Sequence, residues 1–146
     1  MRMRLILLTF ALLFLVLPHS ADARDVLAGP LTGQVLAVLD GDTVTVRLHI
    51  WIGQDIETHV RINGIDTPEK RGKCMSERAR AEQSRLALAQ LLADGKIQLR
   101  DIRHEKYAGR VLATATASDG TPIAEYLIGK NLARAYAGGK RQGWCS

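Results

Sequence analysis

Four carboxylates fall in two close pairs that suit a hard cation. Asp40 and Asp42 are separated by one glycine, and Asp66 and Glu69 lie on either side of a Thr-Pro dipeptide. Proline fixes its own φ and removes a backbone donor, so the second pair lies on stiff backbone. Carboxylate oxygens suit Ca²⁺ or Mg²⁺ better than zinc. Asp-Gly-Asp alone is usually an ordinary turn, so the prediction depends on whether the two pairs meet.

Two arginines have the chemistry to hold a phosphate beside such a cation. Arg61 precedes the second carboxylate pair, and Arg110 lies later in the chain. A guanidinium matches the charge that builds on phosphate oxygens when a phosphodiester is attacked. Glu69 could then take the proton of the attacking water, a contribution of roughly 10²–10⁴ in rate. Alternatively, each arginine is a solvated strand residue and Glu69 only favours a helix N-terminus.

The residues between the two carboxylate pairs predict a β-hairpin. Apolar and polar residues alternate over 43–52 and 56–62, which is typical of half-buried strands. Five apolar residues share one face of the first strand: Val44, Val46, Leu48, Ile50 and Ile52. A loop centred on Gln54 would place three like-charged pairs opposite each other: Arg47 and Arg61, His49 and His59, and Asp42 and Asp66. Because such pairs destabilise a ladder, this register calls for an anion at the arginines and a cation at the aspartates.

The remaining pattern predicts a small α+β domain that is mainly β. Further strands are expected over 31–39, 97–102 and 111–117, with a helix over 76–93 and a short closing helix over 122–129. Ser76 is expected to cap the long helix, and Gly95 to end it. A helix between the third and fourth of five strands is the order of an OB-fold barrel, which often binds oligonucleotides.

The first 23 residues have the pattern of a secretory signal peptide. Two early arginines precede an apolar run over 5–17, and Ala21-Asp22-Ala23 fits the cleavage pattern. The run is too short to span a bilayer as a helix, although an uncleaved anchor is the alternative. We therefore expect one domain over 24–146, periplasmic or secreted, with no membrane attachment after cleavage.

Two cysteines and a formal net charge of +5 add to this interpretation. An even count in an exported chain favours a disulfide between Cys74 and Cys145, with two unrelated thiols as the alternative. A basic exported domain favours polyanionic partners, although most basic surface only aids solubility. The four histidines are scattered and do not have zinc-site spacing.

Three motifs together resemble the thermonuclease family, the staphylococcal-nuclease-like proteins. They are Val38-Leu-Asp-Gly-Asp-Thr-Val44, Arg61-Ile-Asn-Gly-Ile-Asp-Thr-Pro-Glu69 and Lys106-Tyr-Ala-Gly-Arg110. The resemblance covers nearly all of residues 32–136. It implies an OB-fold barrel that cleaves phosphodiester bonds of DNA and RNA with Ca²⁺ and leaves 3′-phosphates.

The resemblance also implies roles for the candidate residues. Asp42, Asp66 and the carbonyl of Thr67 resemble the Ca²⁺ ligands, and Asp40 resembles a carboxylate behind them. The catalytic groups implied are Glu69 as general base and Arg61 and Arg110 as phosphate-binding guanidinium groups.

The third motif differs from the family at one position. Lys106, Tyr107 and Tyr136 resemble residues around the bound nucleotide, but the family usually reads Lys-Tyr-Gly-Arg where this chain has an added Ala108. One added residue in a plain strand would turn Arg110 to the opposite face. The glycine before Arg110 makes a compensating bulge plausible.

Two functions remain for comparison. The first is an exported Ca²⁺-dependent nuclease, monomeric and with little sequence specificity, because phosphate contacts carry no sequence information directly. The second is a non-catalytic OB-fold module that binds single-stranded nucleic acid. That module needs stacking aromatic side chains, which are few here, and gains nothing from carboxylates that face a polyanion.

Overall fold

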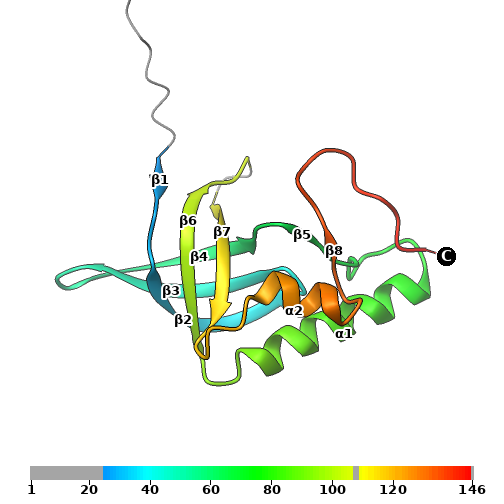
Figure 1. Ribbon diagram of the computed structural model, residues 1–146, viewed down its shortest axis with the longest axis horizontal. Coiled ribbons are helices and arrows are strands. Elements are labelled where there is room, and N and C mark those ends of the chain that lie inside the picture. The colour runs from blue at the N-terminus through cyan, green and yellow to red at the C-terminus, as the bar shows by residue number, and fades with distance from the viewer. Residues whose placement is uncertain (1–24, 107–108, 146) are drawn as a thin grey trace, which may run out of the picture.

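Five long strands close into a barrel in the computed structural model, which describes residues 25–106 and 109–145 (Figure 1). They are β2 (Leu31–Asp40), β3 (Thr43–Trp51), β4 (Gln54–Ile62), β6 (Lys96–His104) and β7 (Arg110–Ala117). Neighbouring strands run antiparallel except β4 and β7, which pair in parallel and complete the barrel. The predicted five-stranded OB-type barrel is confirmed.

Three further strands are too short to leave a pattern in the sequence. β1 (Val26–Leu27) pairs with β6. β5 (Ile65–Asp66) pairs with β8 (Arg134–Ala135) in a separate two-stranded sheet. This second sheet brings the C-terminal segment beside the residues that follow β4.

The β3–β4 hairpin turns earlier than predicted. Ile52 and Gly53 form the turn, and Gly53 has a φ of 70°, which favours glycine. β4 therefore begins at Gln54, the residue that we expected at the centre of the loop. A bulge between His49 and Trp51 changes the register further. Together they shift the pairing by four positions, so that Arg47 faces Glu57.

The predicted like-charged ladder pairs of arginine and histidine are therefore wrong. Each pairs with an acidic residue instead: Arg47 Nη2 lies 2.6 Å from Glu57 Oε1, and His49 Nδ1 lies 2.7 Å from Asp55 Oδ1. Such pairs stabilise a ladder, so no bound anion is needed there. Because the shift is an even number of residues, the same side chains still face the barrel interior.

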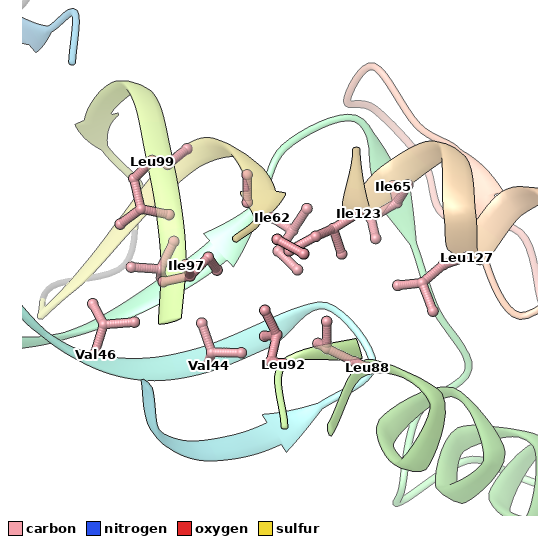
Figure 2. Close-up of a cluster of buried hydrophobic side chains, with 14 of the residues drawn as sticks. Val44, Val46, Ile62, Ile65, Leu88, Leu92, Ile97, Leu99, Ile123 and Leu127 are labelled. Carbon is pink, nitrogen blue, oxygen red and sulfur yellow. The ribbon is translucent and has the colours of Figure 1, made fainter. Parts of the chain in front are cut away.

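One hydrophobic core joins the barrel to helices α1 (Met75–Leu91) and α2 (Ile123–Gly129) (Figure 2). The strands contribute Val44, Val46, Val60, Ile62, Ile97 and Leu99, and the helical side contributes Leu88, Leu92, Ile123 and Leu127. Ile50 and Ile52 do not join this core: they are 44% and 87% exposed, because the hairpin tip projects beyond the barrel (Figure 1).

Helix α1 packs closely against the turn between β2 and β3. An ideal Cβ placed on Gly41 would lie 2.6 Å from Ser84 Cβ and 3.2 Å from Thr67 Cβ. Only glycine fits between the helix and the segment after β5 at this contact. The core thereby fixes the Asp-Gly-Asp turn next to Thr67.

The N-terminus of α1 differs from the prediction. The N-cap residue is Cys74 rather than Ser76. The buried carboxylate of Glu77, in the first turn, accepts backbone N–H groups from Glu69 at 3.4 Å and Lys73 at 3.2 Å. Glu77 thus orders the loop that precedes the helix. Gly95 follows the helix with a φ of 75°, close to where the sequence predicted its end. None of the helices in the described ranges is long and apolar enough to cross a membrane.

Candidate metal and phosphate site

An open pocket at one end of the barrel contains most of the predicted site residues. Its lining includes Asp40, Asp42, Arg61, Thr67, Glu69 and Arg110. These residues come from the β2–β3 turn, the end of β4, the loop after β5 and the start of β7. The fold therefore brings together the three motifs that are far apart in the sequence.

Asp42 is a buried carboxylate held by neighbours on three sides. Its Oδ1 accepts a 2.9 Å hydrogen bond from the Thr43 hydroxyl, and its Oδ2 lies 2.9 Å from Arg61 Nη1. The Thr67 side chain is a further hydrogen-bond partner. Burial raises the pKa of Asp42, and the nearby Arg61 guanidinium opposes that shift. A desolvated carboxylate of this kind gains from any additional cation placed beside it.

Thr67 lines the pocket, and Asp66 is connected to it through the guanidinium of Arg141. Asp66 is 4% exposed, and its Oδ2 accepts a 3.1 Å hydrogen bond from the indole N–H of Trp144. The prediction that Asp42 faces Asp66 across the hairpin ladder is wrong, because β4 ends at Ile62. Both carboxylates nevertheless interact with one cationic group, the guanidinium of Arg141.

Arg141 is the central site residue that the sequence analysis missed. Its guanidinium donates to Oδ1 of Asp66, to Oε1 of Glu69 and, at 3.1 Å, to the carbonyl of Thr67. The tail that carries it has no periodicity that would place it in the site. The signal was the cysteine pair, since a bridge from Cys145 to Cys74 brings the residues before Cys145 close to the loop of Glu69.

The structure contains that bridge. Cys74 and Cys145 form a disulfide with a Cα–Cα distance of 5.9 Å. Glu77 lies beside the two sulfur atoms, and the three residues are close enough together to resemble a metal-binding group. Because both sulfurs are bonded to each other, this group acts as a structural tie rather than as a set of thiolate ligands.

The two predicted phosphate-binding arginines lie in the same region. Arg61 is mostly buried and donates from Nη2 to the carbonyl of Ile65 at 3.3 Å. Arg110 begins β7 opposite His59 of β4, and Glu105 holds its guanidinium through two hydrogen bonds. Both arginines line the carboxylate pocket and the neighbouring one. The added Ala108 lies outside the described residues, and it does not turn Arg110 away from the site.

A second pocket adjoins the first and contains two of the three predicted nucleotide-side residues. Lys106 and Tyr136 line it, together with Arg103 and His104, which the sequence analysis did not select. Tyr136 is tied in place, because its hydroxyl donates to the Gly139 carbonyl at 2.7 Å. Tyr107 lies outside the described residues. The shared arginines make the two pockets one continuous basic surface.

Asp40 lies at the rim of the carboxylate pocket. Its Oδ1 is 3.5 Å from Lys70 Nζ, and the same ammonium group donates to the carbonyl of Leu39. The side chain is about half exposed. Asp40 therefore adds negative charge at the rim of the pocket, and within the described residues it makes no hydrogen bond to Arg141.

The oxygens of this site fit a hard cation such as Ca²⁺. Asp42, Asp66 and Thr67 are buried and offer only oxygen donors, the type that Ca²⁺ binds. Oxygens of Asp66, Thr67 and Glu69 already converge on one positively charged group. Because these oxygens already surround a guanidinium, the same arrangement suits a metal cation.

The family model described as staphylococcal nuclease homologue matches residues 59–143, which is more than half of the chain. The matched segment includes Arg61, Asp66, Glu69 and Arg110, together with Arg141 of the tail. No curated protein matches the chain.

Proposed function

Because the chain belongs to the staphylococcal nuclease homologue family, as its motifs indicated, we propose that it is an exported Ca²⁺-dependent nuclease. Membership by itself indicates a nuclease or a nucleic-acid-binding protein with nucleic acid as its partner. The observation that carries the catalytic proposal is a pocket in which the buried carboxylate of Asp42 lies beside Arg61 and Arg110. Arg141 lines the same pocket and binds Asp66, a second buried carboxylate. A protein that only binds a polyanion has no use for that cluster, because carboxylates repel phosphates.

In this proposal Asp42, Asp66 and the Thr67 carbonyl hold Ca²⁺. When bound, the ion would polarise the phosphoryl group and supply an activated water. Glu69 is about half exposed at the mouth of the pocket, where its carboxylate can accept the proton of the attacking water. The proposed metal ligands are buried, as suits groups that hold an ion in place. Glu69 is more exposed, as suits a general base that must contact water and substrate.

The arginines hold the phosphate and stabilise the charge that develops on it. Arg61 is fixed between Asp42 and the Ile65 carbonyl, so little side-chain entropy is lost when substrate binds. Glu105 orients Arg110 in the same way. Preorganised donors of this kind lower the activation free energy most when they face the position where negative charge develops in the transition state.

The second pocket would bind the adjoining nucleotide. Lys106 supplies positive charge and Tyr136 an aromatic ring, neither of which distinguishes one base sequence from another. We therefore propose cleavage of both DNA and RNA with little sequence preference. The family resemblance adds the expectation of 3′-phosphate products.

Export and a monomeric state complete the proposal. The pattern of residues 1–23, which lie outside the described ranges, supports a signal peptide. The Cys74–Cys145 disulfide is consistent with an oxidising compartment, the periplasm or the medium.

Digestion of single-stranded DNA by the oxidised protein over residues 24–146 tests this function. We expect fragments in the presence of Ca²⁺, none with excess chelator, and 3′ ends that a phosphatase can dephosphorylate. Cleavage that persists under chelation would contradict the metal role. Tight binding without cleavage at any Ca²⁺ concentration would favour the single-stranded nucleic-acid-binding module instead.

A further inference from the structure

The guanidinium of Arg141 occupies the oxygens that the proposed function assigns to Ca²⁺ and to the general base. Asp66 Oδ1, the Thr67 carbonyl and Glu69 Oε1 all accept hydrogen bonds from it. Two of these oxygens belong to proposed metal ligands, and the third belongs to the group that must contact water. A divalent ion at the same oxygens would meet a like charge at contact distance, which is strongly unfavourable at a partly buried site.

Arg141 lies on a segment whose two ends are fixed. At the N-terminal end, the backbone N–H of Tyr136 donates to the Gly64 carbonyl at 2.8 Å. At the C-terminal end, Cys145 is bonded to Cys74, and buried Trp144 stacks under Arg134 with 3.7 Å between guanidinium carbon and ring centre. Figure 1 shows the chain after β8 arching away from the body and returning to the start of α1.

The part between these anchors is exposed and is held by few contacts other than those of Arg141. Residues 137–143 are all exposed, in contrast to Trp144. Besides the contacts of Arg141, two carbonyls of this segment accept hydrogen bonds from β8 and its neighbour: Gly143 from Arg134 at 2.9 Å and Gly139 from Tyr136 at 2.7 Å. Gly138 and Gly139 have φ angles of 103° and 91°, in a region where glycine is favoured and where the chain has no side chain to pack. Arg141 can therefore leave the carboxylates while both anchors stay in place.

We propose that residues 137–145 form a tethered latch in which Arg141 competes with a divalent cation for the oxygens of Asp66 and Thr67. The inference rests on the proposed function, since it requires Ca²⁺ to bind at those oxygens. A group held on a short tether acts at an effective concentration on the order of millimolar. The latch therefore keeps the site closed at low Ca²⁺ and yields to Ca²⁺ at higher concentration, and the disulfide sets how strongly it competes.

Calcium titration by calorimetry, without substrate, tests the latch on the oxidised protein. Arg141→Ala should bind Ca²⁺ about 5- to 150-fold more tightly than wild type, the usual range for coupling between two binding events. Lys140→Ala is the matched control. It removes the same charge from the same exposed segment, at a residue whose side chain makes no hydrogen bond or ion pair within the part of the chain that the structure describes. Its Kd should stay near the wild-type value.

A double-mutant cycle separates the tether from the guanidinium. Cys145→Ser frees the tail and should tighten Ca²⁺ binding in the wild-type background, but should add nothing in Arg141→Ala. Additive effects of the two substitutions would overturn the role of the tether. Chemical reduction of the wild-type disulfide gives the same comparison if the serine variant fails to fold.

The outcomes also distinguish the latch from the function on which it rests. If Arg141→Ala binds Ca²⁺ no more tightly than wild type, the latch is overturned and the metal site stands. If neither protein binds Ca²⁺, the metal site is overturned and the latch with it. Tightening in Lys140→Ala equal to that in Arg141→Ala would mean a general charge effect, and would also overturn the latch.

Discussion

The indole N–H of Trp144 donates a 3.1 Å hydrogen bond to Asp66 Oδ2, across 78 residues of sequence. Both side chains are 4% exposed, so this contact replaces water at a carboxylate that Arg141 also binds. The C-terminal tail is thus part of the candidate site, and its aromatic anchor satisfies an oxygen of a proposed metal ligand.

Trp144→Phe should therefore destabilise the protein. It keeps an aromatic ring against Arg134 but removes the donor to Asp66, and a buried polar group left without its partner costs about 1–3 kcal/mol. The free energy of unfolding from urea denaturation measures the effect. Trp51→Phe is the control, because Trp51 lies on the projecting hairpin at 68% exposure and should change stability little. Equal effects at the two positions would contradict the role given to the hydrogen bond.

Glu69→Gln should retain binding of nucleic acid and lose most turnover. The amide keeps the size of the side chain but cannot accept the proton of the attacking water, which should lower kcat by roughly 10²–10⁴. Steady-state cleavage of single-stranded DNA gives kcat, and fluorescence anisotropy gives affinity. Glu57→Gln serves for comparison, since Glu57 pairs with Arg47 on the hairpin away from both pockets. Near-normal turnover of Glu69→Gln would remove Glu69 as the base.

Much of the barrel could be predicted because its strands alternate strictly between core and surface. The residues expected inside, such as Val46 and Ile62, are buried. The hairpin register could not be predicted, because it depends on the length of the turn and on a bulge close to it. Gly53 accepts a positive φ, so the shorter turn forms. The bulge between His49 and Trp51 then completes the shift, so that Arg47 meets Glu57.

Only the site residues that belong to a sequence motif could be predicted. Asp42, Thr67 and Glu69 come from such motifs and line one pocket. Arg141 has no motif, and its contacts depend on where a distant disulfide places an aperiodic tail. Long-range contacts of this kind follow from the folded barrel, so that local sequence patterns cannot reveal them.

Arg110→Lys should lower turnover even though the charge is kept. A lysine cannot reproduce the planar two-point contact of a guanidinium with phosphate, and loss of one such transition-state donor costs about 10²–10³ in kcat. Arg85→Lys is a suitable control, because Arg85 pairs with Glu82 on the surface of α1 and lines neither pocket. Unchanged kcat in Arg110→Lys would mean that Arg110 does not contact the phosphate. The residue added at Ala108 would then have removed this arginine from the catalytic site.

Gly41→Ala tests whether the packing of α1 against the turn positions the proposed metal ligands. The new methyl group would lie 2.6 Å from Ser84 Cβ on α1. Because α1 is packed into the core through Leu88, moving it to relieve this contact would disrupt that packing. We therefore expect a loss of about 1–3 kcal/mol in unfolding free energy. Because the same methyl group presses on Thr67, the rise in melting temperature on adding Ca²⁺ should also shrink. Gly129→Ala, at the end of α2, has open space around its added methyl and should be neutral. A Gly41→Ala variant with normal stability and a normal Ca²⁺ response would show that the turn can move away from α1, and that the site does not depend on this contact.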